Sequence, residues 1–213
     1  MATCVPSITI SIINWKSEVK KYSFLVTGIA GFISLHVAQT LLPQGARVVG
    51  LVNFNDFNDY YSPTLKRDQD MELRQYPNFV SIEGDLADLP LLQALFKSHA
   101  SDKIRHLAPW RLRPGCAMPW NPFAYQKANL EGFLNFLELA KPNQVERFAY
   151  ASSSSSSVYA GLTELPFAET QRVDMPISLY AATKKANELI AHSYSQLFGL
   201  AIRRKRNESF LKT

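Results

Sequence analysis

The sequence predicts a doubly wound α/β fold, in which helices cover both faces of a parallel sheet. Short β-branched runs alternate with longer amphipathic stretches along the chain, and this alternation favours parallel strands joined by right-handed crossovers. The 213 residues, 46% of them hydrophobic, are enough for one packed domain. Ligands of such sheets bind at the carboxyl ends of the strands, so the residues that follow each strand are the candidate site residues.

The elements follow one another in a regular order. Buried apolar runs predict strands at 23–27, 47–52, 78–83, 103–108 and 145–151. Helical spacing predicts helices at 32–42, 66–75, 89–98, 125–140 and 179–198. Turn-forming residues predict loops at 53–63 and 109–122. We therefore expect a poorly ordered leader over 1–21, a domain over 22–201 and a basic tail over 202–213.

Composition excludes several classes of protein. No apolar run approaches the roughly 20 residues that a bilayer-spanning helix needs, and the mixed charges and high hydrophobicity exclude a disordered chain. Two cysteines, Cys4 and Cys116, give neither a disulfide framework nor metal-ligand spacing, so we expect no metal and a cytoplasmic setting. The formal net charge is +5, but most of it lies in residues 203–213. The basic character therefore belongs to the tail, where it predicts a solvated end.

A glycine turn follows the first strand. Gly28 and Gly31 stand between that strand and the next helix, in the order G-x-x-G-x-x-S with Ser34 last. A dinucleotide pyrophosphate needs a tight turn, close backbone approach and free N–H groups at a helix N-terminus. Glycine pairs also occur in ordinary turns, but the strand before and the helix after favour nucleotide binding.

Two further patterns carry possible chemistry. Tyr180 and Lys184 are four residues apart on the predicted 179–198 helix, so they share one face. A nearby ammonium lowers the pKa of a phenol and makes it a usable proton acceptor, although Y-x-x-x-K is common by chance and also fits an exposed aromatic beside a lysine. The serine run 152–157 follows the fifth predicted strand. This run is either a flexible linker or the source of a hydroxyl group at the edge of the sheet that also carries the glycine turn.

With these features the chain resembles the extended short-chain dehydrogenase/reductase superfamily, and within it the sugar-nucleotide epimerases, most closely the UDP-glucuronate 4-epimerases. The resemblance covers about residues 22–200 and implies a Rossmann-like domain. It rests on these motifs: T-G-x-x-G-F-I at 27–33, N-D-Y-Y at 58–61, G-D-L at 84–86, H-L-A at 106–108, N-P-x-x-Y at 121–125, N-L-E-G-F at 129–133, Y-A-S at 150–152, V-Y at 158–159 and S-L-Y-A-A-T-K-K-A at 178–186.

The resemblance implies an NAD-dependent 4-epimerase that converts UDP-glucuronate to UDP-galacturonate through a 4-keto sugar. Tyr180 would take the 4-hydroxyl proton while hydride passes from C4 to NAD. Lys184 would assist Tyr180 and bond the nicotinamide ribose. One serine would bond the 4-hydroxyl. Counting back from Val158 selects Ser155 and counting forward from Ala151 selects Ser153; we favour Ser155.

The resemblance also implies a set of cofactor-binding residues. The two glycines would hold the pyrophosphate, Asp85 and Leu86 would lie beside the adenine, and Asn129 would support the site. The implied set is Gly28, Gly31, Phe32, Ile33, Asp85, Leu86, Ala108, Asn129 and Lys184.

Four departures from the family pattern matter. Ser34 replaces a third glycine, and Val52 stands where the family has an acidic residue for the adenosine ribose, which weakens NAD binding by about 1–3 kcal/mol if the hydroxyls go unpaired. The segment 109–116 does not match the family, and the match stops at Ile202. We therefore expect an impaired epimerase that lacks the C-terminal substrate region and exposes a sheet edge and an apolar helix face.

Two alternative functions remain open. The first is a nucleotide-sugar dehydratase or decarboxylase on the same scaffold, although the serine run 152–157 offers a dehydratase no acid beside the serine. The second is a non-catalytic nucleotide-binding remnant or interaction module that uses the basic tail. We expect a UDP-sugar as the small-molecule partner and neither nucleic acid nor membrane, and the sequence leaves a homodimer open.

Overall fold

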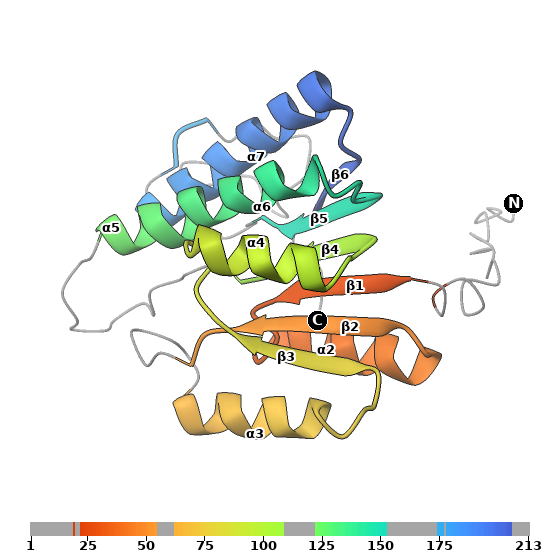
Figure 1. Cartoon of the computed structure of the whole chain (residues 1–213). Coiled ribbons are helices and arrows are strands. Elements are labelled where there is room, and N and C mark those ends of the chain that lie inside the picture. Colours follow the sequence, from red (N-terminus) through yellow and green to blue (C-terminus); the bar gives the residue numbers. More distant parts are fainter. Residues whose placement is uncertain are drawn as a thin grey trace, which may run out of the picture.

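A six-stranded parallel sheet forms the centre of the molecule in the computed structural model (Figure 1). The structure describes residues 19, 22–54, 62–108, 122–152, 174–176 and 178–205. The strand order is β3-β2-β1-β4-β5-β6. The strands are β1 (Ser23–Thr27), β2 (Arg47–Val52), β3 (Phe79–Glu83), β4 (Lys103–His106), β5 (Arg147–Ala151) and β6 (Ile202–Lys205). The order reverses between β1 and β4, and this reversal is where open α/β sheets bind their ligands.

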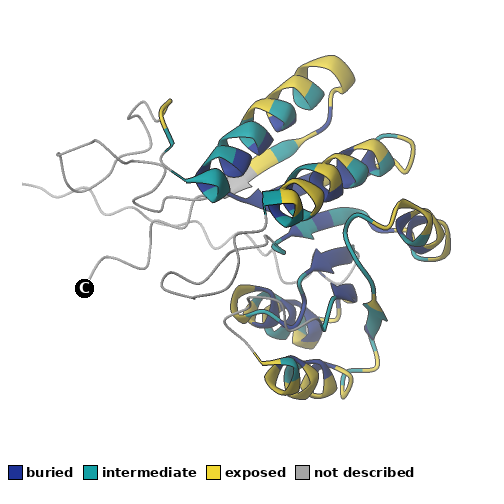
Figure 2. Ribbon diagram, turned by 90° about the vertical axis from the view of Figure 1, so that its left-hand side faces the viewer, coloured by how far each residue is buried: buried dark blue, intermediate teal, exposed yellow. Residues whose placement is uncertain are grey.

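Helices cover the sheet in two layers (Figures 1 and 2). One layer contains α2 (Phe32–Leu41), followed by the short 3₁₀ turn η1 (Leu42–Gln44), and α3 (Pro63–Leu73). The other layer contains α4 (Leu89–Ser98), α6 (Gly132–Ala140) and α7 (Leu179–Phe198). The short α5 (Pro122–Tyr125) and the π-helix η2 (Gln126–Glu131) lead into α6. The doubly wound fold predicted from the sequence is therefore confirmed.

Local capping residues explain where the helices begin and end. Asp88 caps α4 by accepting a hydrogen bond from Leu91 N, and Ser178 caps α7 by accepting one from Ala181 N. Both helices have the predicted bounds. The helix α3 begins at Pro63 rather than at residue 66, because Ser62 caps it and proline suits its first position.

The core is divided by the sheet into two clusters. Leu25, Ile104 and Phe148 from the strands pack with Phe133 and Phe136 of α6 on one side. Val26, Val48 and Ile29 pack with Leu35 and Ala38 of α2 on the other side. In Figure 2 the strands are mostly dark blue and the outer sides of the helices yellow, which agrees with this division. Within the described residues, no helix is both long and apolar enough to cross a bilayer.

Two segments differ from the sequence-based expectation in the type of element that they form. The segment Ile202–Lys205, assigned above to the basic tail, is a strand that pairs with β5, with Ile202 beside Phe148 and Arg203 beside Ala149. Ile202 packs against the core, and the exposed Arg203 follows it on the outermost strand of the described sheet, where charges are tolerated. The expected helix over 125–140 is divided by η2, because a π-helix inserts its extra residue without a simple sequence signal.

Candidate active site

The glycine turn between β1 and α2 is held in place by both neighbouring strands. Gly28 has a φ of +65° and donates a hydrogen bond from its N–H to Leu51 O at 2.8 Å. A Cβ on Gly28 would lie 2.8 Å from Cβ of Ala108 at the end of β4, so only glycine fits. Gly31 is the N-cap residue of α2 and supplies no side-chain acceptor. The first amides of α2 therefore form an uncapped, positively polarised helix end that suits a phosphate.

Ser34 occupies the position of the third glycine and is accommodated by a hydrogen bond. Its side chain is buried, and its Oγ donates to Thr27 O at 3.2 Å. A buried hydroxyl without a partner would destabilise the turn. Because this one has an acceptor on β1, the serine is compatible with the close packing of α2 on the sheet.

Thr27 joins the end of β1 to the end of β4. Its Oγ1 accepts hydrogen bonds from Leu107 N at 3.0 Å and Ala108 N at 3.2 Å, and it lies 3.3 Å from His106 Nδ1. A hydroxyl whose lone pairs accept two N–H groups has its own proton left to donate. The hydrogen-bond pattern therefore assigns Nδ1 of His106 as the acceptor and Nε2 as the protonated nitrogen.

His106 is kept neutral by its surroundings. Its ring packs against Phe133, Phe136 and Phe148. Burial, followed by the charge of Lys184, lowers the pKa of His106 to about 3. Thr27 and His106 were not predicted as site residues. The sequence places each at a strand end, but their hydrogen bond spans 79 positions of the chain.

Asp85 lies where β2 and β3 end, and it is bound by Asn53. Asn53 Nδ2 donates to Asp85 Oδ2 at 3.2 Å, and Ala87 N donates to Asp85 Oδ1 at 2.9 Å. Leu86 packs so closely on α6 that a Cβ on Gly132 would lie 2.7 Å from Leu86 Cβ. Val52 is buried in the core beside α2. Asp85 therefore supplies a carboxylate at this edge of the sheet. Asn53 is a polar neighbour that the sequence analysis missed, although it directly follows a strand.

Lys184 is buried on α7 and reaches the end of β5. Its Nζ donates to Ala151 O at 3.1 Å and lies 5.9 Å from the centroid of the Tyr180 ring. The side chain is 2% exposed, and burial lowers its pKa to about 7. The Tyr180 ring lies 6.4 Å from the ring of the buried Tyr125. The structure thus places Lys184 beside Tyr180, as helical spacing predicts.

Asn129 supports the first turn of α7. Its Nδ2 donates to Thr183 Oγ1 at 3.1 Å, and Thr183 Oγ1 donates to Tyr180 O at 2.8 Å. Asn129 and Thr183 are both buried. The Asn129–Thr183 hydrogen bond therefore holds the π-helix η2 against the first turn of α7.

The predicted site residues are distributed over the carboxyl ends of β3, β1, β4 and β5. Gly28 follows β1, Asp85 follows β3, Ala108 follows β4, and Lys184 is bonded to the last residue of β5. The ends of β1 and β4 approach so closely that a Cβ on Gly28 would clash with Ala108. Lys184 is near enough to His106 for its charge to lower the pKa of that histidine. Ser155, its alternative Ser153 and the segment 109–116 lie outside the described residues.

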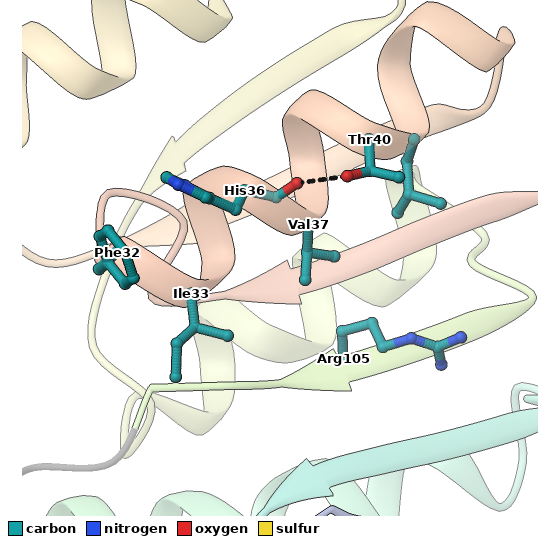
Figure 3. A pocket seen from close by; sticks show the side chains of 7 residues that line it. Phe32, Ile33, His36, Val37, Thr40 and Arg105 are labelled. Carbon is teal, nitrogen blue, oxygen red and sulfur yellow. Dashed lines mark hydrogen bonds between the residues drawn. The ribbon is translucent and has the colours of Figure 1, made fainter. Parts of the chain in front are cut away.

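A separate groove lies on α2 (Figure 3). Arg105 and His106 are neighbours on β4, so their side chains point to opposite faces of the sheet. His106 faces α6, and the groove is on the other face. Phe32 and Ile33 contribute their side chains to this groove, and they are the first two residues of α2. The groove encloses about 350 Å³ and is lined by Phe32, Ile33, His36, Val37, Thr40, Leu41 and Arg105.

Comparison with known proteins gives consistent matches over most of the chain. The family model described as GDP-mannose 4,6 dehydratase matches residues 25–208. UDP-glucuronate 4-epimerase 3 of Arabidopsis thaliana is 45% identical over 181 residues, which are 85% of this chain and 40% of that protein. An uncharacterised 37.6 kDa protein of Escherichia coli O111:H- is 46% identical over 177 residues, which are 83% of this chain and 51% of that protein.

Solved structures show the same architecture. UDP-glucuronic acid 4-epimerase from Bacillus cereus, in complex with UDP-glucuronic acid and NAD, superposes with a TM-score of 0.71 at 30% identity, over 86% of this chain and 55% of that one. An epimerase from Methanothermobacter thermautotrophicus superposes with a TM-score of 0.75 at 28% identity, over 92% of this chain and 55% of that one. The chain thus spans about half the length of the proteins it matches.

Proposed function

Because the chain belongs to the family of sugar-nucleotide epimerases and dehydratases whose model is described as GDP-mannose 4,6 dehydratase, we propose that it carries the NAD-binding and proton-transfer part of a sugar-nucleotide 4-epimerase. The observation that carries this proposal is the position of Lys184. It is buried, bonded to Ala151 O at the carboxyl end of β5, and one helical turn from Tyr180. Such an ammonium is placed to stabilise a phenolate at the edge of the sheet that also holds the glycine turn.

The residues at this edge fit most of an NAD molecule. The uncapped end of α2 and the Gly28–Gly31 turn suit the pyrophosphate. Asp85 and Leu86 are proposed beside the adenine, and Ala108 and Lys184 on the nicotinamide side. When bound, NAD would accept the hydride from C4 of the sugar and return it. Val52 does not fit this pattern, because a buried valine offers the adenosine ribose no hydrogen-bond acceptor.

Tyr180 is the proposed general base. Its phenol would take the 4-hydroxyl proton of the sugar, and the Lys184 ammonium would favour the phenolate that makes this possible. Asn129 would keep Tyr180 in register through Thr183, whose hydroxyl holds Tyr180 O. A serine hydroxyl, assigned to Ser155 by family resemblance, would bond the same 4-hydroxyl. The proton would return from Tyr180 after the 4-keto sugar has presented its other face.

UDP-glucuronate is the proposed substrate. This choice is supported by the relatives named UDP-glucuronate 4-epimerase, which are 40–46% identical to this chain. The description of the family model favours a second candidate, a 4,6-dehydratase. The two activities share proton removal at O4 and differ in their products.

Titration with NAD followed by incubation with UDP-glucuronate tests the proposal. We expect NAD to bind and UDP-galacturonate to form. In a parallel incubation with GDP-mannose, formation of a 4-keto-6-deoxy product would support the dehydratase instead. Absence of NAD binding at millimolar concentrations would overturn both proposals for this chain.

A further inference from the structure

Two hydrogen bonds join the end of β5 to one side of α7. Lys184 Nζ donates to Ala151 O at 3.1 Å, and Ser152 Oγ donates to Glu188 Oε1 at 2.6 Å. Lys184 and Glu188 are four residues apart, so they lie on the same side of the helix. Their partners, Ala151 and Ser152, are consecutive in the chain. The helix therefore holds the chain at the point where it leaves the sheet.

The Ser152–Glu188 bond has the properties of a strong anchor. Ser152 is 5% exposed, and a hydroxyl donating to a carboxylate in a poorly hydrated setting makes one of the stronger hydrogen bonds. In contrast, the bond between Lys184 and Ala151 O depends on where the backbone of β5 places that carbonyl group. An anchor at the next residue fixes the orientation of that peptide unit, because the Ala151–Ser152 peptide is planar and contains the carbonyl group.

We propose that Glu188 is a positioning residue, which holds Ser152 so that the Ala151 carbonyl keeps the Lys184 ammonium in place beside Tyr180. The expected effect of Glu188 on catalysis rests on the proposed function, whereas its expected effect on the order of the chain at Ser152 rests on the Ser152–Glu188 bond alone. Glu188 is not proposed to touch substrate or cofactor. It acts through Ser152, which directly follows β5, and Ala151, the last residue of β5, and its position along α7 places it two turns from Tyr180.

Substitutions in the full chain test this assignment. Glu188→Ala removes the acceptor, Glu188→Gln keeps an acceptor oxygen without the charge, and Ser152→Ala removes only the donor. Glu138→Ala is the matched control, because Glu138 lies on α6 and bonds Lys141 and Tyr194 rather than β5. The variants are compared by epimerase kinetics and by amide hydrogen exchange of peptides that contain residues 148–152.

We expect Glu188→Ala to lower kcat about 10- to 100-fold, as small misplacements of a site do, with KM for the sugar nucleotide within about threefold of the original. Glu188→Gln should recover most of the loss, and Ser152→Ala combined with Glu188→Ala should lose no more than Glu188→Ala alone. Exchange at 148–152 should rise in Glu188→Ala and stay unchanged in Glu138→Ala.

The assignment would be overturned if the losses of kcat from Ser152→Ala and Glu188→Ala were additive in the double variant. It would also be overturned if neither Ser152→Ala nor Glu188→Ala changed the hydrogen exchange at 148–152. A chain that converts no sugar nucleotide would instead contradict the proposed function, and hydrogen exchange would then decide on Glu188 by itself.

Discussion

Thr27 Oγ1 lies 3.3 Å from His106 Nδ1 while it accepts the N–H groups of Leu107 and Ala108. One hydroxyl thereby fixes the end of β4 against the end of β1, on the two strands between which the sheet order reverses. The same contact brings Ala108 to the face of Gly28. The proposed binding site for the nicotinamide thus depends on Thr27, which is the first residue of the glycine motif T-G-x-x-G-F-I.

Thr27→Val should destabilise the chain. Valine has a similar volume but removes the partner of the buried His106 Nδ1 and of the half-buried N–H groups of Leu107 and Ala108. An unpaired buried group costs about 1–3 kcal/mol, and the two half-buried groups cost less because water can reach them. We expect the free energy of unfolding, measured by urea denaturation, to fall by roughly 2–4 kcal/mol. Thr40→Val is the control, because Thr40 is on the exposed side of α2 and its hydroxyl donates to His36 O within the same helix. Equal effects of the two substitutions would contradict the role of Thr27.

Gly28→Ala and Gly199→Ala separate backbone strain from close approach. Both glycines have positive φ, at +65° and +67°. A Cβ on Gly199 would have no described atom within 4 Å, whereas one on Gly28 would meet Ala108. Gly199→Ala should cost about 1 kcal/mol from strain alone, and Gly28→Ala should cost more and abolish NAD binding. Thermal denaturation and NAD titration measure both effects. An NAD affinity unchanged by Gly28→Ala would remove the turn from the site.

Acid should destabilise the chain through His106. Burial lowers the pKa of His106 from 6.5 to about 3, so the unfolded chain binds the extra proton between these two values and stability falls as the pH drops through that window. One such group contributes at most about 1.4 kcal/mol per pH unit. Urea denaturation at pH 6.5, 5.5 and 4.5 measures the slope. His106→Gln should reduce it by up to that amount, and a variant with the original slope would show that other groups carry the acid sensitivity.

Val52→Asp should tighten NAD binding. It restores a carboxylate at the end of β2, and pairing of the adenosine ribose hydroxyls is worth about 1–3 kcal/mol. Because Val52 is buried in the core, the same change should destabilise the chain without NAD. Calorimetric titration with NAD measures the gain, and Val52→Ala, which adds no acceptor, should show none. An affinity that does not increase would mean that residue 52 does not face the ribose.

Short-range signals made much of the fold predictable. The bounds of α4 and α7 could be predicted because Asp88 and Ser178 cap them and their apolar spacing is regular. The strand β6 could not, because Arg203 and Lys205 do not resemble a strand until β5 is present beside them. Likewise, the glycine turn and the Tyr180–Lys184 pair are local patterns, whereas the Thr27–His106 and Ser152–Glu188 bonds join residues 79 and 36 positions apart.

Conversion of UDP-glucuronate by the original chain and by Tyr180→Phe, with NAD affinity measured for both, tests the central claim most directly. We predict that the original chain forms UDP-galacturonate and that the variant binds NAD with unchanged affinity but forms at least about 100-fold less product, because only the proton acceptor is removed. A variant as active as the original chain would contradict the account.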